Sequence, residues 1–414
     1  MSEDHGVPAT PAAATTEPVA FLDLGTNSMR LLVVRVEPDG SYAILTQQKE
    51  AVRLGDGAFA TEELQPDAIE RTVLVGARFA EMARSFGARE IHAVATSATR
   101  DASNRRVLLD RLRDEGGLDV RVISGREEAR LIYLGVASGA RLSGETALFI
   151  DVGGGSTELI VGTDSEHLFL DTHRLGAIRL ANLFFLPDDP NPIGDDRWEL
   201  VSRYVRAHVV RSVQRLREYD LDLAIGSSGT IQTLGEVVAQ RTLGRPLEKH
   251  DTFTREQLRE GLRMLAALPA AERLRVPGMS ANRVDLIVPG GIVFDVLLEE
   301  VGVDRVAISD RTLRDGLLME HVARCDPHGE MEHLSFRAQS VLRLAKKCRV
   351  DLEHTRHIAR LALEMFDTAR EAGLHDLGPW ERELLEYAGM LHDVGTFLTY
   401  TNHRQHSHLS LIHI

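Results

Sequence analysis

The chain has 414 residues, 43% of them hydrophobic and 27% charged, which is the balance of a globular protein long enough for several domains. This composition excludes a wholly disordered, collagen-like or small disulfide-rich protein, and no stretch reaches the roughly 18 apolar residues of a membrane span. The net charge of -14 argues against general nucleic-acid binding, which depends on neutralising phosphates, but allows a polyanion bound in a local basic funnel.

Residues 1–18 form a Pro/Ala/Thr-rich tail that is acidic where a signal peptide carries positive charge. We expect this tail to be disordered. The only two cysteines, Cys325 and Cys348, favour a reducing compartment over a disulfide scaffold. We therefore expect a cytoplasmic protein that binds neither membranes nor nucleic acid.

Strands are predicted where short apolar or β-branched runs are bounded by turn residues. In chain order, these runs are 19–24, 31–36, 91–95, 120–123, 147–152, 159–161, 223–225 and 306–308. Helical spacing of apolar residues predicts a helix over 67–86, between the second and third runs. Strands mixed with helices predict an α/β body.

The sequence contains an internal repeat that covers two pairs of these predicted strands. FLDLGTNSMRLLVV (21–34) aligns without a gap on FIDVGGGSTELIVG (149–162), so that Asp23 matches Asp151 at an offset of 128 residues. Each copy reads as a strand, an Asp-x-Gly turn, polar residues and a second strand. Two copies of one hairpin predict a duplicated domain with a cleft between its halves.

The residue types of the repeated hairpin suit phosphate. Glycine lets backbone N–H groups approach an anion, and hydroxyl and amide side chains, such as those of Thr26, Asn27 and Ser156, add donors. An aspartate at the end of the first strand suits a hard cation. One copy alone would more often be an ordinary hairpin turn, whereas two matched copies favour a phosphate site. A third turn, IGSSGT (225–230), follows a strand and opens a helix, which is a further anion site.

The adjacent glutamates at 127 and 128 differ in the face of the helix they occupy. Ser124 followed by Glu127 is a capping-box pattern, and Arg130 offers Glu127 a surface ion pair. Glu128 has apolar or small residues at i+3, i+4 and i+7, so it lies on the inward face. An inward carboxylate is a candidate site residue, and the alternative is a carboxylate satisfied by an arginine elsewhere in the fold.

These turns resemble the phosphate loops of the actin, sugar-kinase and heat-shock chaperone superfamily. Further segments narrow the resemblance to the exopolyphosphatase and guanosine pentaphosphate phosphohydrolase family: TSATR (96–100), ISGREEARLIYLGV (123–136), RLGAIRL (174–180), VPGG (288–291) and SDRTLRDGLL (309–318). The resemblance implies two duplicated actin-like (ribonuclease H-like) subdomains, 19–132 and 133–320, around a cleft. Arg311 departs from the family, which usually has glycine there.

The resemblance also assigns roles within the cleft. Glu128 is implied as the catalytic general base, and Asp151 and Glu158 as ligands of Mg²⁺, although Glu158 reads equally well as a solvated strand residue. The implied phosphate-binding residues are Asp23, Gly25, Thr26, Asn27, Ser28, Arg100, Gly153, Gly154, Gly155, Ser156, Gly229 and Thr230. Arginine suits bidentate recognition of phosphate, but a lone arginine such as Arg100 is otherwise more often a surface charge.

Residues 321–414 show helical periodicity without a good strand and hold 11 of the 17 histidines, which predicts a separate helical domain. The set His354, His392-Asp393, His403 and His406 resembles the HD phosphohydrolase fold, whose His/Asp set binds divalent metal. The pattern is incomplete: the chain departs from the family after residue 408 and stops before the last metal-ligand aspartate is expected. We expect a truncated HD-like domain for substrate binding and dimer contacts.

Together these features predict a Mg²⁺-dependent exopolyphosphatase that releases terminal orthophosphate from inorganic polyphosphate and forms a homodimer. Polyphosphate is favoured because the helical domain would extend a channel for a long chain. The alternatives are a guanosine pentaphosphate (pppGpp) 5'-phosphohydrolase and a non-catalytic regulator that binds an alarmone or nucleotide. A superfamily kinase would need an acceptor pocket, and ISGREEARL argues for water as the acceptor. A pure regulator could lose Glu128 and Asp151, which are both present.

Overall fold

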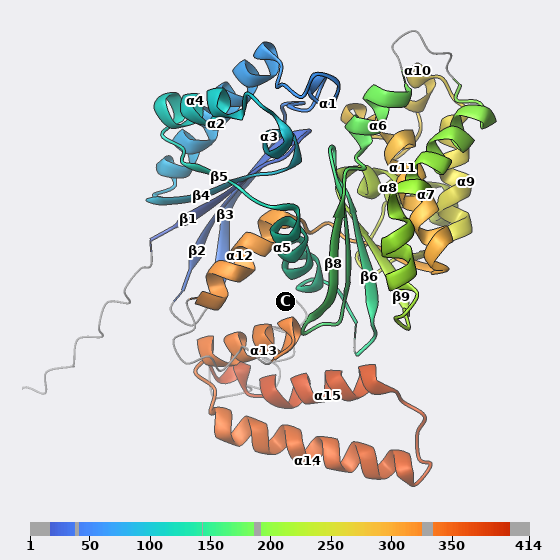
Figure 1. Ribbon diagram of the computed structural model, residues 1–414. Helices are drawn as coiled ribbons and strands as arrows, with labels where there is room; N and C mark the ends of the chain where they lie inside the picture. Colours follow the sequence, from blue (N-terminus) through green and yellow to red (C-terminus); the bar gives the residue numbers. More distant parts are fainter. Residues whose placement is uncertain (1–16, 38–40, 143, 186–191, 325–333, 398–414) are drawn as a thin grey trace, which may run out of the picture.

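The computed structural model describes residues 17–37, 41–142, 144–185, 192–324 and 334–397. Two mixed β-sheets form two lobes, two helices cross between the lobes, and a helical domain lies against them (Figure 1). Most of the tail predicted to be disordered (1–16), together with His403, His406 and the segment after residue 408, lies outside the described residues.

The first sheet has the strand order β3-β2-β1-β4-β5. Its strands are β1 (Val19–Leu24), β2 (Ser28–Val36), β3 (Tyr42–Ala51), β4 (Glu90–Ala95) and β5 (Val120–Val122). β1, β2 and β3 form an antiparallel meander, and β4 and β5 run parallel to β1.

The second sheet repeats this order as β8-β7-β6-β9-β11 and adds β10 at its edge. Its strands are β6 (Ala147–Val152), β7 (Thr157–Gly162), β8 (His167–His173), β9 (Leu223–Ser227), β10 (Thr252–Thr254) and β11 (Arg305–Ile308). β6, β7 and β8 are antiparallel, and β9 and β11 are parallel to β6. The sequence repeat is therefore a repeat of sheet topology, and β1 and β6 coincide with the predicted strands.

Three strands, β3, β8 and β10, were not predicted from the sequence. β3 and β8 are edge strands with few buried positions, and Gln48 and Lys49 on β3 are exposed, so no buried apolar run marks them. β10 has only three residues. Edge strands need less burial than central ones, which is why the apolar pattern missed them.

Helices cover the outer face of each sheet, and each lobe has its own hydrophobic core between its helices and its sheet. In the first lobe they are α1 (Ala58–Thr61), α2 (Pro66–Ser85), α3 (Ser97–Asp101) and α4 (Arg105–Gly116). In the second lobe they are α6 (Ala177–Phe184), α7 (Asp195–Leu216), α8 (Gly229–Leu243), α9 (Arg255–Ala266), α10 (Ala270–Arg273) and α11 (Ile287–Val301). α2 agrees with the predicted helix to within a residue at each end.

The two lobes are joined by α5 (Gly125–Ala137) and α12 (Leu313–Arg324), which follow the corresponding strands β5 and β11. The two helices pack closely because glycines lie at their crossing: a Cβ on Gly316 would stand 1.8 Å from the carbonyl oxygen of Leu131, and one on Gly135 2.3 Å from that of Thr312. Their apolar faces form a third core with the inner faces of both sheets. This crossing fixes the helix that carries Glu128.

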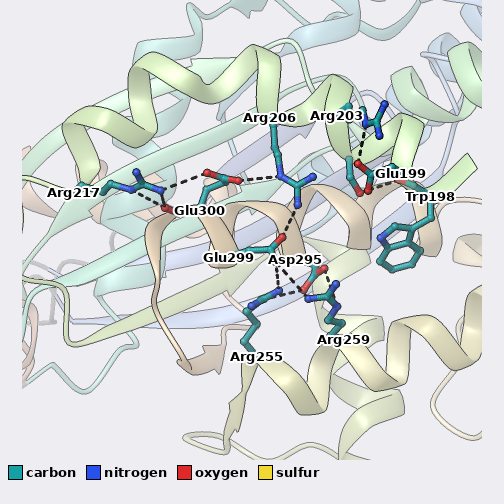
Figure 2. Close-up of polar contacts among 11 residues, drawn as sticks. Trp198, Glu199, Arg203, Arg206, Arg217, Arg255, Arg259, Asp295, Glu299 and Glu300 are labelled. Atoms are coloured by element: carbon teal, nitrogen blue, oxygen red, sulfur yellow. Dashed lines mark hydrogen bonds and ion pairs between the residues drawn. The ribbon is translucent and has the colours of Figure 1, made fainter. Parts of the chain in front are cut away.

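A charged network anchors α11, which is buried without interruption from Ile287 to Leu298. Figure 2 shows arginines of α7 and α9 gathered around the carboxylates near its C-terminal end. Arg206 donates to Glu299 at 2.7 Å and to Glu300 at 2.9 Å. Linked ion pairs hold a helix better than isolated surface pairs do. The network therefore fixes α11 in the frame of the second lobe, away from its cleft-facing start.

The helical domain consists of α13 (Phe336–Lys347), α14 (Leu352–Glu371) and α15 (Pro379–Leu391). Its buried apolar cluster is small, and Met365 on α14 is 74% exposed, as expected for a poorly covered helical face. Trp380 on α15 meets the second lobe at Arg141, whose guanidinium carbon lies 5.4 Å from the ring centroid. No described helix is long and apolar enough to cross a membrane.

Candidate active site

The two repeated hairpins turn toward each other at the cleft between the lobes. Their turns close in the same way: the Gly25 N–H donates to the Ser28 carbonyl at 3.1 Å, and the Gly153 N–H to the Ser156 carbonyl at 2.9 Å. A Cβ on Gly154 would lie only 2.9 Å from the Cβ of Thr26. The turn of the second lobe is therefore free of side chains where the turn of the first lobe approaches it.

A cavity of about 90 Å³ lies between these turns. The predicted site residues that line it are Asp23, Gly25, Thr26, Asn27, Ser28, Glu128, Asp151, Gly153, Gly154, Gly155, Ser156 and Gly229. Three further predicted residues, Arg100, Glu158 and Thr230, stand behind this lining. The structure thus gathers the three separate glycine turns and the inward glutamate around one small polar space.

Glu128 lies in the first turn of α5 and is 7% exposed. The Arg100 Nη1 donates to Glu128 Oε2 at 2.8 Å and to the carbonyl oxygen of Ile123 at 3.0 Å. Both alternatives raised by the sequence therefore hold in part. Glu128 has an arginine partner from elsewhere in the fold, and it also faces the cavity. That partner is the arginine for which the family resemblance implied a phosphate contact.

Glu127 points away from the cavity, and its polar contacts stabilise the start of α5. Its backbone N–H donates to the N-cap hydroxyl of Ser124 at 3.1 Å, as the capping pattern predicts. Its carboxylate, however, pairs with Arg121 at 2.5 Å, and Arg130 pairs instead with Glu320 of α12. The predicted Glu127–Arg130 pair is wrong because Arg130 turns toward the crossing helix and Arg121 on β5 is closer.

Burial shifts the carboxyl groups at the cavity toward their neutral forms. Burial raises the pKa of Asp23 to about 6 against the opposing charge of Arg30. It raises the pKa of Glu128 to about 7, opposed by Arg100 and assisted by the charges of Asp23 and Asp151. The pKa of Asp151 is also raised by burial, although the Ser227 hydroxyl donates to its Oδ2 at 2.5 Å.

Glu158 lies directly behind this group, opposite Asp151 in the register of β6 and β7. It is 1% exposed and accepts a hydrogen bond from the Thr172 hydroxyl at 3.0 Å. Burial, followed by the charges of Glu128 and Asp151, raises its pKa well above the usual range. The buried position rules out the solvated alternative considered from the sequence.

These carboxylates fit a divalent metal by the chemistry of their donors. Asp23, Glu128 and Asp151 bring oxygen ligands to one cavity, with Glu158 close behind. Oxygen ligands are those that Mg²⁺ prefers, and a cation among like charges would relieve their mutual repulsion.

Two arginines that line the cavity were not predicted from the sequence. Arg30 lies opposite Asp23 in the register of β1 and β2 and occupies the repeat position that Glu158 holds in the second copy. Arg283, 6% exposed, lies in a short 3₁₀ turn (Ala281–Arg283) before α11, with its Nη2 within 2.6 Å of a Cβ placed on Gly229. The repeat offset pointed to Arg30, whereas no local motif marked Arg283. Both supply positive charge to a polyanion site in an acidic protein.

The third glycine turn carries backbone strain at the cavity wall. Ser228, the N-cap of α8, has a φ of +92°, a backbone conformation that residues other than glycine rarely adopt. Its hydroxyl accepts hydrogen bonds from the N–H groups of Thr230 and Ile231. Strain of this kind persists where the surroundings hold it, and it is frequent at ligand sites.

Contacts across the mouth hold the lobes together. Arg53 of the first lobe pairs with Asp285 of the second at 2.5 Å. Asp101 of the first lobe pairs with Arg179 of α6 at 2.6 Å, and the Arg179 guanidinium carbon lies 3.9 Å from the ring centroid of Phe59. These contacts hold the two lobes together beside the cavity, whose size suits a terminal phosphoryl group more than a long chain.

The histidine set of the helical domain gathers in part at a separate place. One ligand atom each from His354, His392 and Asp393 lie within 4.8 Å of one another. The remaining predicted members, His403 and His406, lie outside the described residues.

A two-lobed α/β fold of repeated topology, with matched phosphate-type turns and buried carboxylates at its cleft, defines an actin-like phosphate-binding protein. Residues 32–325 match the Ppx/GppA phosphatase family, and residues 336–414 match domain III of the same family. The chain belongs to the Ppx/GppA phosphatase family.

Solved structures agree with this assignment. An exopolyphosphatase from Cytophaga hutchinsonii is 27% identical, with 74% of this chain and 98% of that chain covered at a TM-score of 0.70. A Ppx/GppA family member from Aquifex aeolicus is 27% identical, with 75% and 99% covered at a TM-score of 0.62. The protein is accordingly a phosphoanhydride hydrolase, of the kind that acts on polyphosphate or guanosine pentaphosphate.

Proposed function

We propose that the protein is a Mg²⁺-dependent exopolyphosphatase that releases terminal orthophosphate from inorganic polyphosphate. The observation that carries the proposal is the single cavity shared by two phosphate-type turns and the carboxylates of Asp23, Glu128 and Asp151. Phosphoryl transfer asks little covalent chemistry of a protein, but it needs positioned donors and charge compensation around the transferred group.

In this proposal Glu128 is the general base. It accepts a proton from water as the water oxygen bonds to the terminal phosphorus, and the bond from that phosphorus to the bridging oxygen breaks. The bridging oxygen stays with the shortened chain. A pKa near 7 suits a base that works at neutral pH, and the hydrogen bond from Arg100 to Oε2 orients the carboxylate. Arg100 is thus proposed to position the base in addition to its implied contact with phosphate.

The turns are proposed to hold the terminal phosphoryl group. Backbone N–H groups of the glycine turns and the polar side chains of Thr26, Asn27 and Ser156 supply donors to its oxygens, and Arg30 and Arg283 offset its charge. Asp151 would hold Mg²⁺ with support from Glu158. When bound, Mg²⁺ neutralises charge on the phosphates and on the leaving oxygen.

Polyphosphate is proposed over guanosine pentaphosphate because the helical domain lies against the second lobe and would lengthen the track for a chain. The grouping of His354, His392 and Asp393 supports an HD-like identity for this domain. We propose that it binds substrate and forms the contacts of a homodimer.

The test is side-by-side turnover of long-chain polyphosphate and guanosine pentaphosphate, with Mg²⁺ and with EDTA. The proposal predicts orthophosphate release from polyphosphate that EDTA abolishes. Turnover of guanosine pentaphosphate alone would establish the alternative substrate. Tight binding of either compound without turnover would establish a regulator.

A further inference from the structure

A second cavity, of about 250 Å³, lies on the second lobe where it faces the helical domain. It shares no lining residue with the active-site cavity. Its walls include the residues just after α5 and just before α12, so it lies at the far end of the helix whose first turn carries Glu128. Nine residue steps, about 14 Å along the helix axis, separate Glu128 from Ala137, whereas on the other wall Thr312 of the active-site lining directly follows Arg311 of this cavity.

The floor of this cavity is apolar. It is formed by side chains of β9 and β11, among them Leu223, Ile225 and Ala307. These residues belong to the sheet face that α5 and α12 cover elsewhere. Because α5 ends at Ala137, the strands are less completely covered at this end, where Ala307 is partly exposed and Leu223 and Ile225 are 6% and 4% exposed.

The rim of the cavity is positively charged. Arg305 is neutralised by Glu145 at 2.5 Å. Arg311 donates to the hydroxyl of Ser138 at 2.7 Å, and neither it nor Arg141 nor Lys249 forms an ion pair with a carboxylate in the described part of the chain. Asp310 is a carboxylate of the same rim, so positive charge remains in excess.

The positive groups converge on His250. Burial and then the charges of Arg141, Lys249 and Arg337 lower the pKa of this histidine. His250 has φ of +72°, a left-handed conformation that is uncommon outside glycine and worth a functional explanation. Arg337 is paired with Glu383 at 2.8 Å, which leaves Arg141, Lys249 and Arg311 as the rim charges that favour an anion between them.

We propose that this cavity binds a small organic phosphate, with its phosphate among Arg141, Lys249 and Arg311 and its flat apolar part on the strand floor. A purely inorganic phosphate would use the rim and leave the floor unused. A neighbouring cavity of about 320 Å³ shares Arg141 and includes Trp380, which gives a planar group a further surface on the helical-domain side. The chemistry of the two surfaces therefore selects a nucleotide-like anion.

The test is isothermal titration of the full chain with ADP and, separately, with inorganic pyrophosphate, in EDTA to prevent turnover. We expect ADP to bind, and Lys249→Glu to weaken it by about tenfold, because attraction at the rim becomes repulsion. Lys249→Glu/Arg141→Glu should abolish it. Pyrophosphate should bind this site at least about tenfold more weakly than ADP, since it forgoes the apolar floor.

Two control variants locate the site. Arg211→Glu makes the same kind of charge change on α7, whose helix packs in the core on the opposite sheet face, and should leave ADP binding unchanged. Arg283→Ala alters the cleft and should also leave it unchanged. Failure of ADP to bind, or loss with Arg283→Ala but not with Lys249→Glu, would overturn the proposal. If pyrophosphate binds as tightly as ADP and is equally sensitive to Lys249→Glu, the site does not recognise an organic group, and that element of the proposal is wrong. Because no step requires turnover, these results do not depend on the proposed hydrolysis.

Discussion

The two lobes present the same hairpin to the cleft but contribute different chemistry. The first hairpin has side chains at its tip, Thr26 and Asn27, where the second has Gly154 and Gly155. A larger residue would not fit at these positions, because a Cβ on Gly155 would lie 2.5 Å from the Phe59 ring of the other lobe. The first turn therefore supplies side-chain donors, and the second supplies backbone and close approach.

The charges of the two hairpins differ in the same way. Opposite Asp23 in the first hairpin stands Arg30, whereas opposite Asp151 in the second stands Glu158. Arg30 offsets part of the cost of burying Asp23, whereas Glu158 adds a second buried carboxylate beside Asp151. Duplication has thus produced one half suited to an anion and one half suited to a cation.

The largest expected effect is the loss of rate when the proposed general base, Glu128, is replaced. The second lobe supplies no counterpart to this residue. Glu128→Gln keeps the shape of the side chain but cannot accept the proton of water, so kcat should fall by about 10²–10⁴-fold while substrate binding changes little. Glu127→Gln is the matched control. It removes an exposed ion pair with Arg121, so about 1 kcal/mol of stability at most and little rate should be lost. Loss of turnover in Glu127→Gln with an active Glu128→Gln would reverse the assignment.

The matched aspartates come next. Asp151→Asn should lower kcat by about 10²–10³-fold at limiting Mg²⁺, because compensation of transition-state charge by a metal contributes several kcal/mol. Its folding should stay near that of the wild type, and added Mg²⁺ should restore part of the rate. Asp23→Asn, whose partner Arg30 remains, should raise the Mg²⁺ concentration for half-maximal rate less than Asp151→Asn does. Equal Mg²⁺ dependence of the two variants would remove the distinction between the lobes.

A smaller effect is expected from filling the close approach of the lobes. Gly155→Ala places a methyl group against Phe59 and Ser97 of the first lobe. We expect a loss of about 1–3 kcal/mol in the free energy of unfolding and a raised KM, since the turns can no longer close together. Gly194→Ala, where a Cβ meets no atom within 4 Å, is the control. Urea unfolding and steady-state kinetics on both variants make the comparison, and similar KM values would contradict it.

The smallest effect concerns pH and Mg²⁺ together. Because the folded pKa values of Asp23 and Glu128, about 6 and 7, exceed the unfolded ones, their contribution to stability is complete below about pH 4. It is lost as pH rises through 6 and 7. Mg²⁺ binds the ionised carboxylates, so the Tm gain from saturating Mg²⁺ should be about 5 °C at pH 8 and close to zero at pH 5. A thermal melt series that gives equal gains at both values would contradict a carboxylate metal site in the cleft.

The central frame was predictable from the sequence because burial leaves a clear pattern. β1 and β6 are buried on both faces, and both begin and end where the apolar runs do. β3 and β8 lie at the sheet edges, where half-exposed polar strands leave no such pattern. The repeat offset of 128 residues was sufficient to predict two halves around a cleft.

The site was predictable only as far as local motifs reach. The three glycine turns and the inward position of Glu128 follow from short-range spacing, and the structure brings them into one cavity. The Arg100–Glu128 ion pair spans two elements, and Arg283 reaches the cavity from a turn without a motif. Contacts of this kind depend on how the lobes pack, which one-dimensional spacing does not encode.

Hydrolysis of polyphosphate in ¹⁸O-labelled water tests the central claim most directly. If the cleft holds the terminal phosphoryl group and Glu128 activates water against it, one ¹⁸O atom enters each released orthophosphate and none enters the shortened chain. Phosphorus NMR or mass spectrometry of the products reads both positions. Label in the remaining chain together with unlabelled orthophosphate would mean that water attacks the adjoining phosphorus, which would contradict the account.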